Sequence, residues 1–347
     1  MPKHHYVPRM LLKYFSTDID KKYINIHLLK DNKFLYNMTL YEQAQKNNLY
    51  GSDQKLEKFY GGLESAASIC LAKLNSGNIN LSKEENWHIK LFLLNQLSRT
   101  PGFISSQDDY IEKQIKYMAS HDKFLKNHLD DLSVGLNKPF NMYSSFSIDL
   151  LFIILDLRIG LLEADNVNSS FVIGQNPVIL LNPYLKEKNW IRSTQGLALK
   201  GLIMIMPISH QYSLILYDGL RYKLINNNPK WIIKDSDVDK LNDFQYCNTN
   251  ECIYFSNLLN EHKYSQKSNF YRNFRENNKA NFEIIGSTID DKTGDKIEIT
   301  KTGLKEFPIE QNFNFLACKA TEYTKPINGY NDAKREHIDE TNICIKI

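Results

Sequence analysis

The hydrophobic pattern of the chain changes its period near Asn166, and this change constrains the fold more than any other feature. Before it, apolar residues recur at helical spacing; after it, they come in the short runs that are typical of β-strands. We therefore predict an α+β fold in which a helical N-terminal half packs on a small, mostly antiparallel sheet from the C-terminal half. We expect a single domain over 1–305, helix-rich over 1–165 and β-containing over 166–305, and then a polar C-terminal extension over 306–347.

The clearest helix signal begins at Ser82. Ser82 and Glu85 have the spacing of a capping box, which closes the first turn of a helix by reciprocal hydrogen bonds. The helix should end near Thr100, because Pro101 follows it. Apolar spacing predicts further helices over residues 52–73, 107–130, 148–162, 235–255 and 261–277.

Alternating apolar residues and turn-forming residues predict three β-hairpins. The first spans residues 23–36 around a polar turn, the second joins runs at 202–206 and 212–217, and the third joins runs at 282–285 and 296–300. Two further short strands are predicted at residues 171–173 and 178–181.

Composition indicates the cellular compartment of the protein but does not identify a binding partner. The 347 residues carry 43 lysines and arginines against 40 acidic residues, and a net charge of +3 gives no overall argument for nucleic acid. No apolar run is long enough for a transmembrane helix, and the N-terminus lacks the apolar core of a secretory signal. Five scattered cysteines do not suggest a disulfide framework. We therefore expect a cytoplasmic protein with no membrane partner.

The N-terminal segment His4-His5-Tyr6-Val7-Pro8-Arg9 concentrates groups that can carry chemistry. Histidine titrates near neutral pH and can act as a general acid or base. Adjacent residues of an extended segment point in opposite directions, so we expect one histidine in a site and the other as a structural hydrogen bonder. Tyr6 can supply a hydrogen-bond donor, and Arg9 a cation suited to a planar phosphate or carboxylate.

This opening resembles that of a widespread, mostly bacterial family of domains of unknown function whose members begin with His-His-Tyr-Val-Pro. The resemblance covers roughly residues 4–275 and includes residues 96–101 and 171–178. Gln175 stands where the family usually carries an acid, which counts against any mechanism that needs that carboxylate. The resemblance implies no settled activity. It adds Gln96, Arg99 and Asn176 to the candidate site residues.

Together these residues favour metal-independent chemistry on a phosphodiester. The predicted catalytic residues are His4, His5 and Arg99, and the predicted substrate-binding residues are Tyr6, Arg9, Gln96 and Asn176. The set is rich in histidine, arginine and amide donors but poor in carboxylates, so we predict neither a metal nor a cofactor. RNA is the preferred substrate because its 2′-hydroxyl is a built-in nucleophile. We predict a nuclease-like effector in a bacterial toxin or anti-phage defence role.

Such an effector would act on RNA or another nucleic acid. It would also bind a protein partner or an antitoxin. Two other functions stay open. One is a non-enzymatic ligand- or partner-binding sensor module of a defence system. The other is a metal-dependent hydrolase that uses His4 or His5 with Asp165 or another acid.

Structural roles also stay open for each candidate. The histidines can be buried groups satisfied by backbone, Gln96 and Arg99 can tie a loop to a helix end, and Asn176 can form a turn. The chain has no phosphate-binding loop, Gly-x-Gly-x-x-Gly, His-Glu-x-x-His or Gly-x-Ser-x-Gly motif, which counts against the common enzyme classes that use them. Convergence of His4, Arg99 and Asn176 in one pocket would discriminate a site from structural roles.

Overall fold

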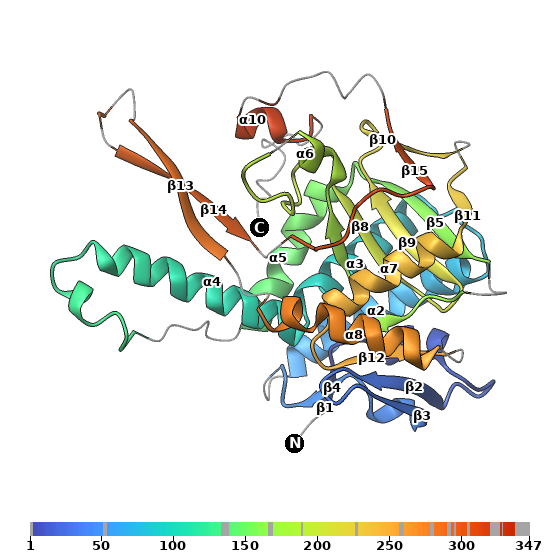
Figure 1. Ribbon diagram of the computed structural model, residues 1–347. Coiled ribbons are helices and arrows are strands. Elements are labelled where there is room, and N and C mark those ends of the chain that lie inside the picture. The colour runs from blue at the N-terminus through green and yellow to red at the C-terminus, as the bar shows by residue number, and fades with distance from the viewer. Residues whose placement is uncertain are drawn as a thin grey trace.

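The structure is a computed structural model, shown in Figure 1. It describes residues 3–50, 54–132, 139–165, 169–188, 190–225, 228–256, 260–277, 281–289, 293–294, 296–303, 306–319, 327 and 329–336.

Two central sheets draw their strands from distant parts of the chain (Figure 1). The larger sheet has five strands, and only its β11–β5 pair is parallel. Its order is β11 (Lys230–Ile233), β5 (Arg158–Ala164), β9 (Tyr212–Tyr217), β8 (Ile203–Pro207) and β7 (Ile179–Leu181). The antiparallel four-stranded sheet has the order β3 (Lys33–Thr39), β2 (Tyr23–Leu28), β12 (Cys252–Phe255) and β6 (Ile173–Gly174).

Three two-stranded sheets complete the β structure of the described residues. They are β1 (Lys3–His5) with β4 (Gln45–Asn47), β10 (Tyr222–Leu224) with β15 (Leu316–Cys318), and β13 (Asn281–Ile289) with β14 (Lys296–Gly303).

Helices occur along the whole chain. The longer ones are α2 (Gln54–Asn75), α3 (Lys83–Ser98), α4 (Pro101–Ser120), α5 (Pro139–Ile154), α7 (Asp235–Cys247) and α8 (Glu261–Glu276). Short helical segments are α1 (Arg9–Leu12), η1 (Lys13–Phe15), η2 (Leu40–Glu42), η3 (Leu125–Asn127), α6 (Pro183–Glu187) and α10 (Tyr330–Ala333). No described helix has both the length and the apolar character needed to cross a membrane.

The predicted fold class, a helical N-terminal half on a C-terminal sheet, is wrong. Helices and sheets are mixed through the chain. The β2–β3 hairpin comes from the first 40 residues, yet β2 pairs with β12 near residue 250. The physical reason is that strand pairing between distant segments leaves no mark on local periodicity, on which the prediction depended.

Three predicted helices also have different bounds or a different structure. Residues 158–162 were predicted as the end of a helix but belong to β5, and residues 252–255, also predicted to be helical, form β12. Both strands are largely buried, and a short buried apolar run fits either kind of element. Helix α4 begins at Pro101, with Thr100 as its N-cap, rather than at residue 107.

The predictions of the helix that begins after Ser82 and of the three hairpins are confirmed. The Ser82 hydroxyl accepts a hydrogen bond from the Glu85 amide, and the Glu85 carboxylate accepts one from the Ser82 amide. The hairpins β2–β3, β8–β9 and β13–β14 are confirmed as antiparallel pairs. Every residue of β8 and β9 is buried, as expected for strands covered on both faces.

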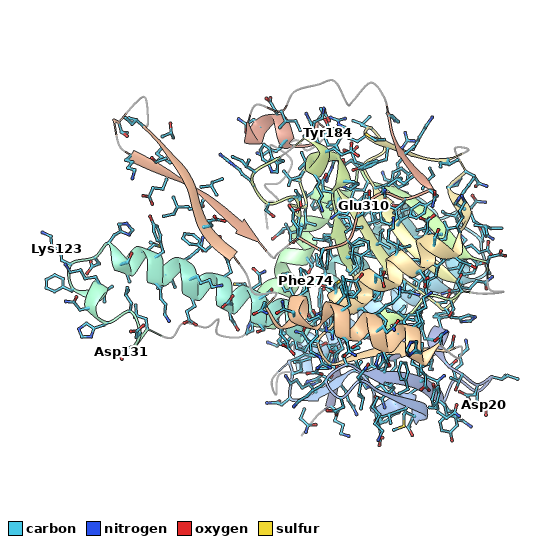
Figure 2. All side chains as sticks on the ribbon, viewed as in Figure 1. Asp20, Lys123, Asp131, Tyr184, Phe274 and Glu310 are labelled. Atoms are coloured by element: carbon cyan, nitrogen blue, oxygen red, sulfur yellow. The ribbon has the colours of Figure 1, made fainter. Side chains whose placement is uncertain are left out.

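An arm extends from the rest of the molecule. It consists of α4, η3 and the β13–β14 hairpin (Figure 1). The rings of Tyr117 on α4 and Phe282 on β13 lie 5.1 Å apart and join its two parts. Figure 2 shows Lys123 and Asp131 at its far end.

The segment after residue 305 contributes to the core. Phe307, Ile309 and Phe315 are buried, and β15 pairs with β10. The domain boundary between 1–305 and the extension 306–347 stays a prediction, and most residues after 319 lie outside the described part of the chain.

Candidate functional site

The N-terminal histidines lie on strand β1 and occupy different environments. His4 is buried, whereas His5 is partly exposed. Pairing with β4 holds the strand extended, and consecutive side chains of such a strand point to opposite sides. This geometry separates the two imidazoles into one interior and one surface group.

His5 lines a cleft of about 330 Å³, which we call the His5 cleft. Its walls come from β1, the α1–η1 segment, helix α2 and the C-terminal end of α3. The lining residues are His5, Arg9, Met10, Lys13, Tyr50, Glu57, Tyr60, Gly61, Glu64 and Arg99.

His4 is fixed behind this cleft by three contacts. Its Nδ1 accepts a hydrogen bond from the Tyr50 amide at 3.1 Å, so the ring proton of the neutral form lies on Nε2. Nε2 is 2.9 Å from a carboxylate oxygen of Glu57, and the ring stacks on Tyr50 at 4.8 Å. The hydrogen bond and the stacking fix both the tautomer and the orientation of His4.

The two ring nitrogens of His5 differ in their contacts. Its Nε2 donates to the backbone oxygen of Tyr41 at 3.1 Å, and the structure shows no hydrogen-bond partner for Nδ1 among the residues it describes. Burial lowers the pKa of His5, and the positive charges of Arg9 and Arg99 lower it further. The ring is therefore neutral at pH 7, with its basic lone pair on Nδ1.

Arg99 connects the walls of the cleft. Its guanidinium donates to the backbone oxygen of His5 at 2.5 Å and to the Glu64 carboxylate at 2.8 Å, and it lies 4.6 Å from the centre of the Tyr60 ring. Burial opposes the charge of Arg99, but Tyr50 and Glu64 outweigh it, so the pKa is raised. Arg99 is only 2 % exposed, which makes it a positioning group for β1 and α2.

Two exposed cations stand at the same cleft. Arg9 stacks on the Tyr41 ring at 4.7 Å, and Lys13 follows one helical turn later. Within the described residues, neither forms an ion pair in this structure. Arg9 and Lys13 are therefore the charges of the cleft that an anionic ligand can reach.

Tyr6 and Gln96 lie inside the protein rather than in the cleft. The Gln96 amide donates to the backbone oxygen of Tyr6 at 2.8 Å, and the Gln175 amide donates to the Tyr6 hydroxyl at 2.7 Å. Burial raises the pKa of Tyr6 well above its usual value. Gln175 also contacts the Glu251 carboxylate at 2.5 Å, so a carboxylate lies beside the position where the family resemblance led us to expect an acid.

Asn176 belongs to a second, small pocket. Its side chain donates to the backbone oxygen of Asn248 at 2.7 Å, and the Asn248 side chain donates back to the Asn176 backbone oxygen at 2.7 Å. Gln96 and Asn176 both line this pocket of about 90 Å³. The structure thus brings His5, Arg9 and Arg99 together in the His5 cleft. In the described pocket linings, His4, Arg99 and Asn176 do not converge, which favours structural roles for His4 and Asn176.

Sequence reasoning missed the contribution of α2. Glu57, Tyr60, Gly61 and Glu64 all line the His5 cleft. Their spacing of three, four and seven residues puts them on one helix face, and this polar stripe was the signal that could have identified them. They add two carboxylates to a site that we expected to be poor in carboxylates. Across the described residues, no group of three or more histidine, cysteine, aspartate or glutamate side chains could hold a metal ion.

Comparison with known sequences and structures adds a family but no activity. The family described as "Protein of unknown function (DUF4238)" matches residues 3–258. No curated protein and no solved structure shows significant similarity to the chain. The matched span includes every residue that lines the His5 cleft.

Proposed function

The chain belongs to the DUF4238 family, and because its description assigns no activity, we propose from the His5 cleft that the protein cleaves RNA phosphodiester bonds without a metal. The observation that carries this proposal is His5, whose pKa is lowered and whose Nδ1 has no hydrogen-bond partner among the described residues, lining the same cleft as two exposed cations. The His-His-Tyr-Val-Pro opening as a mark of the family, a cytoplasmic location and a role in toxin or anti-phage action belong to the same proposal.

His5 supplies the base. A histidine whose pKa lies below its ordinary value is unprotonated at neutral pH and can accept a proton. Nδ1 takes the proton of the ribose 2′-hydroxyl, the 2′-oxygen attacks phosphorus, and the bond from phosphorus to the 5′-oxygen breaks. Solvent protonates the leaving 5′-oxygen, so the products are a 2′,3′-cyclic phosphate and a 5′-hydroxyl.

Arg9 and Lys13 supply the charge that this reaction needs. Negative charge builds on the phosphate oxygens as the pentacovalent state forms, and cations already in place stabilise it. Both side chains are exposed at the cleft, so phosphate oxygens can contact them directly. Arg9 is suited to two oxygens at once, whereas Lys13 acts as a point charge.

The buried candidates support this arrangement indirectly. Arg99 holds the backbone of His5 against α2, and His4 holds β1 against Tyr50 and Glu57. Their substitution should lower cleavage by moving His5. Tyr6 and Gln96 lie inside the protein, so they stay candidates for substrate binding only in an indirect sense. Their hydrogen bond helps to hold the β1–α1 segment in place.

The proposal can be tested with the purified full-length chain and a single-stranded RNA oligonucleotide, with and without EDTA. We expect cleavage that EDTA does not abolish, and a loss of about 100-fold or more in His5→Ala. Arg9→Ala and Lys13→Ala should each reduce the rate less. His121→Ala is the matched control, since this exposed histidine lies at the end of α4, outside the cleft lining.

A DNA strand of the same sequence should not be cut, because it lacks the 2′-hydroxyl. Unchanged cleavage in His5→Ala would contradict the proposal, and unchanged cleavage in His4→Ala and Arg99→Ala as well would remove every predicted catalytic residue. Complete loss of activity with EDTA would instead favour the metal-dependent hydrolase.

One observation favours a binding module as the second candidate. His4 and Arg99, two of the three predicted catalytic residues, are buried and engaged by neighbouring groups. A module of this kind would retain an anionic ligand in the His5 cleft without converting it. Intact RNA that binds the protein, but loses affinity in Arg9→Ala, would support this second function.

A further inference from the structure

A third concave surface, larger than the His5 cleft, lies at the opposite end of α3. It measures about 900 Å³, within the range of small-molecule sites. It lies between the N-terminal part of α3 and the strands β5, β9 and β10. We call it the Trp87 groove, and its lining is Ile79, Asn80, Leu81, Lys83, Asn86, Trp87, Lys90, Leu155, Leu157, Arg158, Ile159, Tyr217, Lys223, Leu224 and Pro229.

The charge of this groove has one sign. Four lining residues are cationic, and the described lining includes no aspartate or glutamate; the cations are Lys83, Lys90, Arg158 and Lys223. Across the described residues, the structure shows no ion pair between these four side chains and a carboxylate. A concave wall with unneutralised positive charge concentrates anions near it.

Trp87 gives the groove an aromatic face. The indole is 43 % exposed although it is a large apolar side chain, and Lys83 Nζ lies 5.8 Å from its ring centre. A flat ring that enters the groove can stack on this indole while its anionic part contacts the cations. Asn80 and Asn86 offer amide donors and acceptors to the edge of such a ring.

One of the four cations, Lys90, is buried at the base of the groove. Its Nζ donates to the backbone oxygens of Leu155 and Leu157, each at 2.7 Å, which fixes the amine at the end of α5. Burial lowers the pKa of Lys90 to about 8, and Arg335 also lowers it, while Asp156 opposes both. An anion in the groove would be attracted to this fixed amine.

From this combination we infer that the Trp87 groove binds a nucleoside phosphate, with the base stacked on Trp87 and the phosphates held by Lys83, Arg158 and Lys223. The cations match the phosphates and the exposed indole matches the base, whereas a purely inorganic anion would leave the aromatic face unused. This inference does not depend on the proposed cleavage at the His5 cleft, because the two lining sets share no residue.

Calorimetry of the full-length chain with ADP, and separately with a four-nucleotide single-stranded RNA, tests the inference. The first probe represents a free nucleotide and the second a polynucleotide. Because single-stranded RNA is also the proposed substrate of the His5 cleft, only binding that the groove variants weaken supports the site, and the probe that binds the groove more tightly identifies the source. Trp87→Ala and Lys223→Glu should each weaken binding about tenfold or more. Raising the salt concentration should weaken it further.

Phe124→Ala and Lys123→Glu are the matched controls. Phe124→Ala removes an exposed aromatic ring at the N-terminus of η3. Lys123→Glu reverses an exposed charge on the arm (Figure 2), and neither residue lines the groove. Binding of neither probe at millimolar concentration, or equal affinity in the groove variants and the controls, would overturn the inference. RNA cleavage by the same preparations is a separate readout, so failure of one proposal does not imply failure of the other.

Discussion

The His5 cleft and the Trp87 groove lie at the two ends of α3, a helix of 16 residues and therefore about 24 Å long, but they hold their positive charge differently. In the cleft, Arg99 is buried, paired with Glu64 and bonded to the backbone of His5. In the groove, Arg158 and Lys223 are exposed and form no ion pair within the described residues. The difference indicates that Arg99 fixes the geometry of the cleft and leaves ligand contact there to Arg9 and Lys13, whereas the exposed cations of the groove are themselves available to a ligand.

The largest expected effect is the difference in the free energy of unfolding between leucine variants of two arginines, Arg99 and Arg158. Arg99→Leu should lower the free energy of unfolding by about 3 kcal/mol, because it leaves Glu64 and the His5 backbone oxygen without their buried partner. Arg158→Leu should change it by less than about 0.5 kcal/mol, as is usual for an exposed position. Urea denaturation measures both values. Equal losses would show that Arg99 does not hold the cleft together.

The next largest effect is a difference in stability between alanine variants of the two N-terminal histidines. His4→Ala should cost about 2 kcal/mol, since it orphans the buried Tyr50 amide and removes a stacked ring. His5→Ala should cost about 1 kcal/mol or less, because this side chain is partly exposed. The same denaturation curves test the difference, and RNA cleavage should show the reverse order at matched folded fractions. A larger stability loss in His5→Ala would reverse the assigned roles.

The pH dependence of the free energy of unfolding should be a smaller effect than either substitution, because it changes only the charge of His5 and removes no contact. The folded protein holds the pKa of His5 below 6.5, so folding favours the neutral ring. The resulting stability is fully present above about pH 6.5 and is lost as the pH falls through the folded pKa. His5→Gln should flatten this part of the stability profile, and it should also remove the acidic limb of the cleavage rate. An unchanged profile would mean that His5 does not titrate in this range.

The smallest expected change in stability comes from substitution of two neighbouring glycines of α2, Gly61 and Gly62. Gly61 lines the cleft and Gly62 does not, and at either position an added Cβ would meet no atom of the described residues within 4 Å. Alanine at each should stabilise the protein by about 0.5–1 kcal/mol through helix propensity. Leucine at 61 should narrow the cleft and slow RNA cleavage, whereas leucine at 62 should not. Thermal unfolding and the RNA assay check the two outcomes, and equal slowing at both positions would argue against the cleft.

Local features of the fold could be predicted from the sequence. The Ser82 capping box and the hairpin turns act within a few residues, so their signals lie side by side in the chain. Strand β12 was predicted as part of a helix because its apolar run acquires strand geometry only by pairing with β2 and β6. Such long-range pairing explains why the predicted division into a helical half and a sheet was wrong.

The candidate site was predictable only in part, for a similar reason. His5, Arg9 and Arg99 were found through an unusual motif and a family resemblance, and the structure brings them to one cleft. Glu57 and Glu64 were missed because a polar stripe on a helix is ordinarily a solvated face. These carboxylates gain partners only in the folded protein, where β1 brings His4 to Glu57 and the C-terminal end of α3 brings Arg99 to Glu64.

The pairing of Leu28 with Cys252 also sets an order for biosynthesis. The β2–β3 hairpin leaves the ribosome long before β12, so one edge of β2 stays open while most of the chain is still being made. An open apolar edge is a template for wrong pairing, and contacts between segments so far apart form slowly. We therefore expect the nascent chain to need chaperone protection, and an isolated fragment of residues 1–165 to aggregate.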